Sequence, residues 1–491
     1  MEVKDAVSLV VDYLNKECQT EIKTEYYSHV RKWRDWWRGY YKPFHSYQEL
    51  GVNNAPTQRE LFRMNMAKRI CEDWAAILLN EKTTLNIDDV ASSEFVQGDK
   101  DAQGIGGVLA YNNFWSEANE LVEKAFGYGG GAFVLRAENA KVNTRGEIVP
   151  DAECKVGIEY IDAMSIIPLS VEKSKVTEVA FVSELVKMGK EYIYLETHTK
   201  DEDGNYVIRN KYFRVDNGSM KPEPLPAGVA ESVNTGSNIP WFVLIYPNIT
   251  NNIECQNGLG MSVFANAIDN LKGVDLAFNN FLRDFKLGGK KVFVNKKMTF
   301  QNADGVTVTP DDVAQSLFSM IGDDIDFDAK QMIQEYNPEL RVTENKEGVQ
   351  TQLDYLSFKC GLGTHRYQFE GGVVKTATEY MGEKQELVQH AYRHMIVIEA
   401  ALVNLCRGIL YIGKTFCKAN VNPDAVITVQ FEDGFIISEE DKANKDLMLV
   451  QNGIMPKWEY RVKHLGETEE EAKAVIDGMK TATENPFNFM G

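Results

Sequence analysis

The sequence has little of what secreted, membrane-spanning or metal-dependent proteins carry. Its seven cysteines are odd in number, widely scattered and without any C-x-x-C spacing, so they predict reduced thiols rather than a disulfide framework or a metal centre. The acidic N-terminal stretch lacks a basic region followed by an apolar one, and we expect no secretory signal. The most apolar stretch, 395–412, contains Glu399, Asn404 and Arg407, which argues against a membrane span.

An excess of positive charge is also missing. Lys and Arg number 53 against 72 Asp and Glu, so the formal net charge is −19. This excludes a protein whose whole surface attracts DNA, because neutralising phosphates requires an excess of Lys and Arg at the contact. It does not exclude a protein that surrounds DNA without gripping it. With 491 residues, of which 44% are hydrophobic, the chain is long enough for two to four globular domains.

The chain does contain a clear succession of periodic patterns. Apolar residues recur at threes and fours through the first ~130 residues, which predicts helices. Short β-rich runs then predict an antiparallel region over about 132–250, where Asp203-Gly204 marks a hairpin. Helical periodicity returns over 260–287 and ends at Gly288-Gly289. A mixed segment with a strand-like KKVFV run follows, and the fold class predicted is α+β, mainly helical.

The C-terminal part predicts more helices. A shorter helical pattern runs over about 347–360, and the GLGTHRYQFEGGVVK loop follows it. Thr376 and Glu379 then have the spacing of a capping box, which starts a helix that could continue to Ile412. Beyond it, AVITVQFEDGFII predicts one or two strands, and the residues from Ser438 predict two or three short helices.

Several strings, in this order, resemble portal proteins of tailed bacteriophages of the siphophage type. They are RMNMAKRICEDWAAILLNEK, GLGMSVFANAIDNLKGVD, VVKTATE and QNGIMPKWEYRVKHLGETEEEA. None is a catalytic signature, so the resemblance depends on their order and combination. It implies a radial subunit with these parts: wing 1–256, first stem helix 257–287, clip 288–343, second stem helix 344–361, tunnel loop 361–375, long wing helix 376–413, wing strands 414–437 and crown 438–491.

The resemblance also implies a function and partners. The subunit would form a homo-oligomer, a twelve-subunit ring at the capsid vertex, through which double-stranded DNA passes during packaging and ejection without sequence-specific contacts. Its partners would be the terminase large subunit, a head-completion or connector protein, and the major capsid and scaffolding proteins. The protein would be found in the virion, and in the host cytoplasm during assembly. It would be no enzyme and need no cofactor, metal or membrane.

Candidate site residues follow from this resemblance. Isolated lysines could centre DNA without trapping it, and two glycines could let the tunnel loop follow a turning duplex. Acidic clip residues could dock terminase or connector proteins. The alternative is that the lysines and carboxylates are solvated surface and the glycines an ordinary turn. The channel candidates are Lys286, Lys290, Lys291, Lys296, Lys297, Gly371, Gly372 and Lys375, and the docking candidates are Asp323, Asp324, Asp326 and Asp328.

One rival pattern favours a different class of protein. Gly408, Gly413, Lys414 and Thr415 match the phosphate-binding pattern G-x-x-x-x-G-K-[ST] of P-loop NTPases. Such a loop follows a strand and opens a helix, whereas here the glycines close a helical pattern and little chain follows. The P-loop NTPase remains an alternative function at this point, as does another ring-forming head or tail adaptor.

Other chemical patterns are weaker. Asp324, Asp326, Asp328 and Glu335 have calcium-loop spacing, but Ala329 replaces the required glycine. His390 and His394 lack the Glu of a zinc-protease motif, so we interpret them as ordinary helix residues. The glycines between 127 and 131 predict a tight connection rather than a dinucleotide loop. RKWRDWWRGYYKPF mixes basic and aromatic residues, as single-strand binders do, but we favour an amphipathic element with its Trp residues packed inward.

Overall fold

The structure is a computed structural model that describes most of the chain. The residues described are 6–17, 21–50, 56–80, 83–99, 106–143, 148–226, 229–253, 258–289, 291–295, 300–301, 307–308, 318–321, 333–368, 377–431 and 439–484. The chain divides into two units, Met1–Val429 and Gln430–Gly491. Helices account for 46% and strands for 25%, so the fold is α+β as predicted, with more helix than strand.

The first part of the chain is helical, but it also contains strands that the sequence did not predict. β1 and β2 form an antiparallel hairpin, and β3 pairs with the distant β20. The elements are α1 (Ala6–Glu17), α2 (Glu25–Trp37), α3 (Lys42–His45), β1 (Ser46–Leu50), β2 (Pro56–Glu60), α4 (Met66–Leu78), β3 (Thr84–Ile87), α5 (Val90–Gln97), α6 (Val108–Tyr111) and α7 (Phe114–Tyr128).

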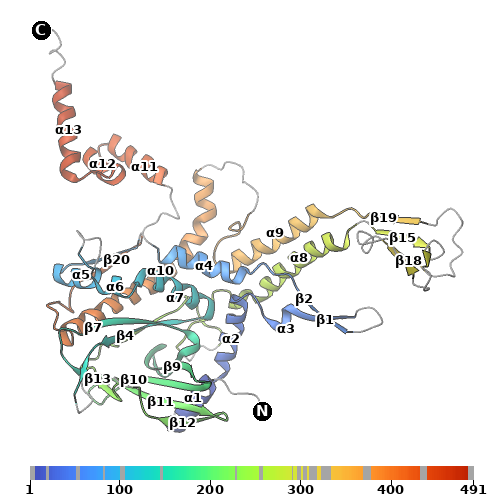
Figure 1. Ribbon diagram of the computed structural model, residues 1–491. Coiled ribbons are helices and arrows are strands. Elements are labelled where there is room, and N and C mark those ends of the chain that lie inside the picture. The colour runs from blue at the N-terminus through green and yellow to red at the C-terminus, as the bar shows by residue number, and fades with distance from the viewer. Residues whose placement is uncertain are drawn as a thin grey trace. The chain divides into compact units, whose positions relative to one another are not determined.

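Two antiparallel sheets follow, over the range that the sequence predicted. One has the order β14-β4-β7, and the other has the order β12-β11-β10-β9-β8 with β13 added on β11 (Figure 1). The elements are β4 (Gly131–Glu138), β5 (Lys141–Val142), β6 (Ile148–Val149), β7 (Lys155–Asp162), β8 (Ile166–Glu172), β9 (Lys175–Lys187), β10 (Lys190–Lys200), β11 (Tyr206–Asp216), β12 (Ser219–Glu223), β13 (Ser232–Asn234) and β14 (Phe242–Ile245). Gly204, with φ +83°, lies in the predicted β10–β11 turn.

Three longer helices and a group of short strands complete the first unit. The elements are α8 (Ile268–Leu287), β15 (Lys291–Asn295), β16 (Phe300–Gln301), β17 (Thr307–Val308), β18 (Phe318–Ile321), β19 (Ile333–Tyr336), α9 (Val342–Lys359), α10 (Ala377–Thr415) and β20 (Ile427–Gln430). β15 pairs with both β18 and β19. The helices predicted over 347–360 and from Thr376 correspond to α9 and α10.

The helix predicted over 260–287 begins later than expected. A single 3-10 turn, Ala265–Ala267, precedes α8, and the residues before it are not helical. Gly260 lies so close to the backbone of Gly129 that a Cβ on it would meet that carbonyl oxygen at 2.6 Å. Its own carbonyl accepts a hydrogen bond from Tyr26 Oη at 2.8 Å. Tertiary contacts therefore hold this segment in an extended path despite its helical periodicity.

The phosphate-loop pattern lies inside a helix. Gly408, Gly413, Lys414 and Thr415 all belong to the last turns of α10, so their backbone N–H groups are not arranged as an anion cradle. The two glycines have a packing reason instead. A Cβ on Gly408 would meet Leu135 of β4 at 2.4 Å, and one on Gly413 would meet Phe95 of α5 at 2.5 Å. The P-loop alternative is therefore wrong at the level of local structure.

The apolar character of α10 also has a packing reason. Gln385–Thr415 is long and apolar enough to cross a membrane by length and composition, yet 56% of its most apolar window is buried within the protein. Leu402, Leu405 and Ile409 are among the buried residues, and the helix contacts β4, β14 and α4. These features are those of a core helix.

The second unit contains the short helices predicted from Ser438. They are α11 (Glu439–Gln451), α12 (Lys457–Leu465) and α13 (Glu469–Glu484). A capping box starts α13, in which Thr468 N–H donates to Glu471 Oε2 at 3.0 Å and Glu471 N–H donates to Thr468 Oγ1 at 3.3 Å. Arg461 forms a two-pronged ion pair with Glu467, which fixes the turn between α12 and α13.

Candidate functional site

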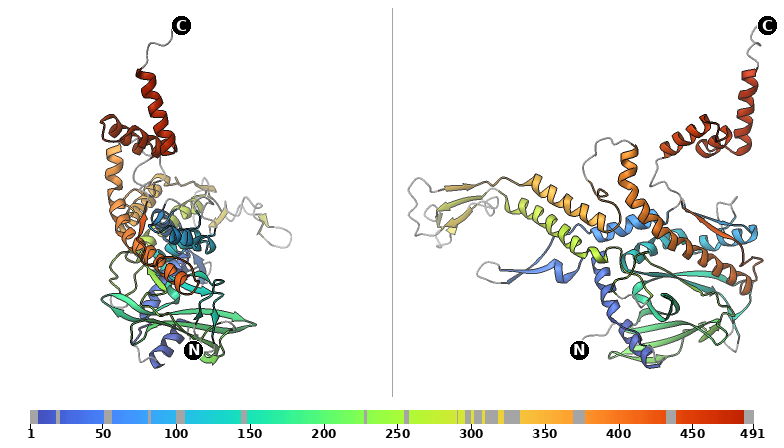
Figure 2. Two further views of the ribbon diagram at one scale, coloured as in Figure 1. Left: turned by 90° about the vertical axis from the view of Figure 1, so that its left-hand side faces the viewer. Right: turned by 180° about the vertical axis from the view of Figure 1, so that it is seen from behind.

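Helices α8 and α9 lie side by side, as the right-hand view in Figure 2 shows. Close approach is possible because α8 has a glycine where α9 crosses it: a Cβ on Gly273 would meet Gln352 Oε1 at 2.5 Å. Asp284 near the far end of α8 accepts from Arg341 Nη2 at 3.0 Å and from Asn345 Nδ2 at 2.8 Å. These two hydrogen bonds lower the pKa of Asp284, so the carboxylate stays charged and continues to join the helices.

The opposite side of α8 holds the β1–β2 hairpin. Buried His45, at the end of α3, contacts buried Asp275 of α8 at 3.0 Å between Nε2 and Oδ2. The other ring nitrogen, Nδ1, lies 2.8 Å from Tyr41 N and 3.1 Å from Tyr41 O, and Nε2 donates to the carboxylate, which can only accept. Met64 N–H donates to Asp275 Oδ1 at 2.8 Å. Both chain segments that flank the hairpin are thus fixed to the same carboxylate.

The chain turns sharply after α9. Gly361 and Gly363 both have positive φ, +76° and +81°, which ends the helix at Lys359. Ser357 Oγ donates to the carbonyl oxygen of Gly363 at 2.5 Å, and Trp74 Nε1 of α4 donates to the carbonyl oxygen of Cys360 at 3.2 Å. The start of the loop that leads toward α10 is therefore held against α4.

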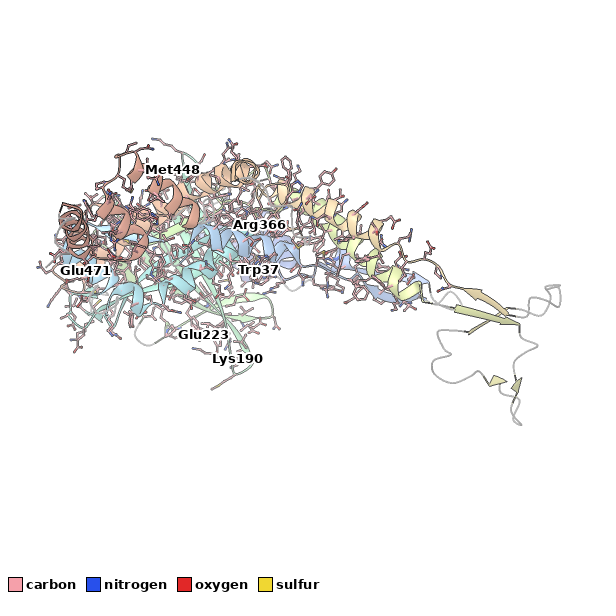
Figure 3. All side chains as sticks on the ribbon, turned by 90° about the horizontal axis from the view of Figure 1, so that it is seen from above. Trp37, Lys190, Glu223, Arg366, Met448 and Glu471 are labelled. Carbon is pink, nitrogen blue, oxygen red and sulfur yellow. The ribbon has the colours of Figure 1, made fainter. Side chains whose placement is uncertain are left out.

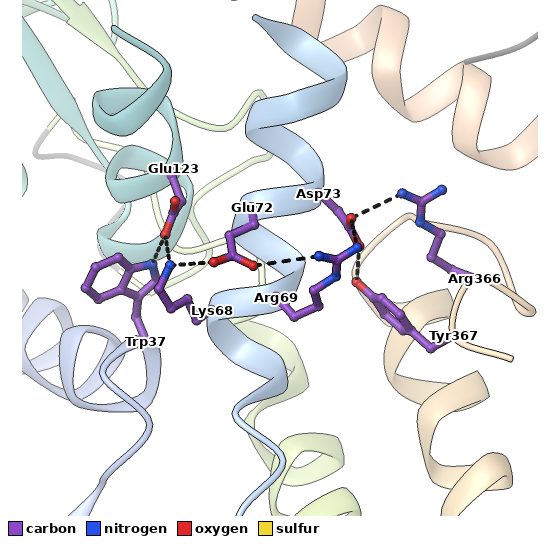
Figure 4. Close-up of polar contacts among 8 residues, drawn as sticks. All are labelled: Trp37, Lys68, Arg69, Glu72, Asp73, Glu123, Arg366 and Tyr367. Carbon is purple, nitrogen blue, oxygen red and sulfur yellow. Dashed lines mark hydrogen bonds and ion pairs between the residues drawn. The ribbon is translucent and has the colours of Figure 1, made fainter. Parts of the chain in front are cut away.

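A buried carboxylate completes this attachment. Asp73 of α4 accepts from Arg366 Nη2 at 3.1 Å and from Tyr367 Oη at 2.8 Å, and pairs with Arg69 Nη2 at 3.0 Å (Figure 4). Burial and the adjacent Asp73 carboxylate raise the pKa of Tyr367 well above its usual range, so its hydroxyl remains a donor. We call Asp73, Arg366 and Tyr367 the loop anchor, because they fix residues 364–368 to α4.

The aromatic and basic stretch between 31 and 44 packs inward. Trp33 and Trp36 are buried, and Trp37 Nε1 donates to Glu123 Oε1 of α7 at 3.1 Å. Lys68 of α4 lies over the Trp37 ring at 5.3 Å and pairs with the same glutamate at 3.1 Å. Figure 3 places Trp37 and Arg366 among the side chains of the first unit. The interpretation of this stretch as an amphipathic packing element is confirmed, and its indole rings are not a stacking platform.

His394 is a core residue of α10, as predicted for an ordinary helix position. Its ring makes edge contacts with Trp74 and Phe126, and its Nδ1 accepts from Asn248 N–H at 3.0 Å. Burial lowers the pKa of His394 to about 3, so the ring is neutral. Among the residues that the structure describes, no group of three or more His, Cys, Asp or Glu side chains could hold a metal ion.

Most of the channel and docking candidates lie outside the described residues. These are Lys290, Lys296, Lys297, Gly371, Gly372, Lys375, Asp323, Asp324, Asp326 and Asp328. Lys286 is exposed in the last turn of α8, and Lys291 begins β15. Of the calcium-loop pattern, only the backbone of Glu335, in β19, is described. The site that these candidates would form therefore stays a prediction.

The loop anchor was not predicted from the sequence. A weak signal exists, since Asp73 falls among apolar positions of α4 and follows Arg69 by four residues, where an ion pair can form. Its other partners lie almost 300 positions further along the chain and belong to no local pattern. Arg366 and Tyr367 were part of the predicted loop, but their role was not.

Comparisons with known proteins identify the family. A family model described as phage portal protein, SPP1 Gp6-like, matches residues 17–484. A solved structure titled "Neck of native GTA particle computed with C12 symmetry" is similar at a TM-score of 0.40 and 10% identity, covering 81% of this chain and 88% of that chain. No curated protein matches the chain. With nearly its whole length matched by one model, this chain belongs to the SPP1 Gp6-like family of phage portal proteins.

Proposed function

We propose that twelve copies of this chain close into a ring at one capsid vertex, and that the ring is a passive conduit for double-stranded DNA during packaging and ejection. The observation that carries the proposal is the family match over residues 17–484. The α8–α9 pair and the anchored loop after it supply the elements from which a channel wall can be built. The protein would act in the virion, after assembly in the host cytoplasm.

Each part of the subunit then has a proposed role. Residues 1–256 and 376–437 would form the wing, α8 and α9 the stem, and 288–343 the clip. The loop that begins at Gly361 would face the channel, and residues 438–491, within the second unit, would be the crown. In this assignment the loop anchor sets where the tunnel loop leaves the subunit, because Asp73 fixes its first residues to α4.

The charge of the chain supports a conduit that does not hold DNA. Each strong phosphate contact would have to break at every step of movement, so a net charge of −19 per subunit favours passage. The exposed face of α9 carries Glu344 and Glu347. Lys286, with the other channel lysines and Lys375, would centre the duplex against this acidic background.

Exposed apolar side chains support ring formation. On α9, Tyr355 and Phe358 are 58% and 50% exposed, and on α10 Ile396 is 64% exposed. Large apolar side chains on helix faces are typical of protein interfaces, whereas a water-filled channel would disfavour them. We therefore assign Tyr355 and Phe358 to the contact between neighbouring subunits of the ring.

Docking partners would bind at the clip and the outer surface. The acidic residues Asp323, Asp324, Asp326 and Asp328 are proposed to meet the terminase large subunit and later a head-completion or connector protein. The major capsid and scaffolding proteins would contact the ring at the vertex. ATP hydrolysis would belong to the terminase, so the ring itself is proposed to have no enzymatic activity.

The test is the assembly state of the purified full-length chain. Native mass spectrometry should give twelve subunits, and negative-stain images should show a ring with a central pore wide enough for a DNA duplex. No ATP hydrolysis should accompany it. A chain that stays monomeric at micromolar concentration, or a ring without such a pore, would contradict the proposal.

A further inference from the structure

Two cysteine thiols meet where β7 begins and α10 has just ended. The sulfurs of Cys154 and Cys417, 263 positions apart in the chain, lie 3.3 Å from each other. Both side chains are buried and free. A backbone hydrogen bond of 2.9 Å from Asp151 N–H to the carbonyl oxygen of Phe416 holds the two segments together beside the sulfurs. The contact is therefore built into the packing of the first unit.

The geometry allows a covalent bond with little movement. A disulfide has a sulfur–sulfur distance of about 2.05 Å, so the two sulfurs need to approach by only about 1.3 Å. We expect rotations of the two side chains to supply this distance. Two cysteines whose side chains pointed apart would instead require a backbone movement.

A pocket borders one of the two cysteines. Cys154 lines a pocket of about 480 Å³ together with Phe95, Tyr111 and Lys155, and Cys417 is not among the lining side chains. Cys154 is 5% exposed, and the pocket lies next to it. We therefore expect a reagent in the pocket to react with Cys154 first. Cys417 lies next to Cys154 and does not line the pocket.

The contact between the thiols also favours this order. Cys417 Sγ–H donates to Cys154 Sγ. This hydrogen bond lowers the pKa of Cys154 against the opposing effect of burial, and raises the pKa of Cys417. Because the thiolate is the nucleophile, we expect Cys154 to react first. Cys417 then attacks the mixed disulfide on Cys154.

We propose that Cys154 and Cys417 form an oxidation site that takes a small disulfide and closes into a disulfide bond. With a small disulfide, the Cys154 thiolate attacks one sulfur and releases one thiol, which leaves a mixed disulfide on Cys154. The Cys417 thiolate, its proton lost to water, then attacks the Cys154 sulfur and releases the second thiol. Two electrons pass from the two cysteines to the reagent, which leaves as two thiols.

The bond would tie the end of α10 to the start of β7. If the chain acts as proposed above, the thiols remain reduced while the ring assembles in the cytoplasm and oxidise after the particle leaves the cell. The change of compartment rests on the proposed function. Disulfide formation between Cys154 and Cys417 does not depend on it, because both cysteines belong to one subunit.

Peptide mapping of the full-length protein tests the proposal. The folded protein is treated with hydroxyethyl disulfide, its remaining thiols are blocked with iodoacetamide in denaturant, and the digest is analysed without reduction. We expect a peptide that links Cys154 to Cys417 and disappears on reduction. The unfolding midpoint should rise by on the order of 5 °C, because the bond closes a long loop.

Matched variants sharpen the test. Cys406 is equally buried on α10, and Cys406→Ser should form the same linked peptide. Cys154→Ser and Cys417→Ser should not. Recovery of both cysteines as separate alkylated peptides, a stable mixed disulfide on Cys154, or a link to another cysteine would overturn the proposal. The peptide map of the wild-type protein tests the Cys154–Cys417 link even if a variant fails to fold. It also tests the link whether or not the chain forms rings.

Discussion

Buried polar side chains join segments of this chain that are far apart in sequence. Asp73 holds the loop after α9 to α4, and Asp275 holds both ends of the β1–β2 hairpin to α8. In each case one buried carboxylate accepts hydrogen bonds from two residues that are far from it in the chain, so its removal would leave both donors without this acceptor. Such a loss costs more than the pair contributes when intact.

Replacement of Asp73 should destabilise the loop anchor. Asp73→Asn removes the charge that faces Arg366, and we expect a loss of about 1–3 kcal/mol in the free energy of unfolding, measured with urea. The neighbouring Glu72→Gln is the control, because its ion pairs with Lys68 and Arg69 are exposed and should contribute below about 1 kcal/mol. Limited proteolysis should also cleave the Asp73→Asn variant faster near residue 368. Equal stabilities of the two variants would contradict the anchor.

His394 should make stability depend on pH. Its pKa is about 3 in the folded protein and about 6.5 when unfolded, so the unfolded chain binds the extra proton between these values. The contribution of neutral His394 to the free energy of unfolding is complete above pH 6.5. It is lost as the pH falls toward 3, by up to about 1.4 kcal/mol per pH unit. His394→Phe should flatten the slope between pH 6.5 and 4.5, as measured by urea unfolding at several pH values.

The pH range from 6.5 to 4.5 avoids the contribution of a second buried group, Glu196. Burial opposes the charge of Glu196, but Arg136 and His198 outweigh it and lower the pKa of Glu196 to about 2. Glu196 therefore loses its contribution between pH 4.5 and 2, below the range used for His394. An unchanged slope in His394→Phe would show that other groups dominate.

For single residues, the sequence patterns predicted which side chains are buried better than they predicted which side chains contact one another. Ile70 and Trp74 lie on the predicted apolar face of α4 and are both buried. The role of Asp73 on the same helix could not be predicted, because Arg366 and Tyr367 reach it only through the tertiary fold. The same holds for Cys154 and Cys417, which the sequence indicated only as scattered thiols.

Helix boundaries depend on where local pattern and tertiary contacts agree. α10 begins one residue after the predicted capping box position Thr376, and α9 ends at Lys359, next to the predicted break at Gly361. α8 starts later than its periodicity suggested, because Gly260 packs against Gly129. The β1–β2 hairpin was missed, since its strands are polar and all five residues of β2 are exposed.

Two glycines inside helices should respond oppositely to the same substitution. Gly348 in α9 has open space where a Cβ would lie, so Gly348→Ala should stabilise the isolated subunit by about 0.5–1 kcal/mol through helix propensity. Gly408 in α10 faces buried Leu135 at 2.4 Å, so Gly408→Ala should destabilise it by about 1–3 kcal/mol. Thermal unfolding of both variants under one condition checks the difference in sign. The same sign for both would refute the packing explanation of Gly408.

Several predictions concern an assembly of many chains, and a single chain does not test them. Most of the channel and docking candidates lie outside the described residues, so the structure does not test the site predicted from the sequence. The order of the quoted strings predicted the family, and the family model over residues 17–484 confirms it. Ring size, lumen residues and docking surfaces stay predictions, because they depend on contacts between chains.

Ring assembly should depend on the exposed aromatic face of α9. Phe358→Glu places a charge where a neighbouring subunit is proposed to pack, and we expect a shift from rings to smaller species in native mass spectrometry. The fold should be retained, since Phe358 is half exposed and surface substitutions change stability by about 0.5 kcal/mol or less. Met188→Glu is the matched control, because Met188 is fully exposed in the β9–β10 turn. Intact rings in Phe358→Glu would remove this face from the interface.

The shared carboxylate of Asp275 has a mechanical consequence. His45, just before the β1–β2 hairpin, and Met64, just after it, are both bonded to this one side chain of α8. Arg283, two turns further along α8, reaches Glu49 of β1 at 3.3 Å. The hairpin is thereby held to α8 by the two segments that flank it and by Glu49 of β1. A displacement of α8 should therefore move the hairpin with it, including the exposed strand β2.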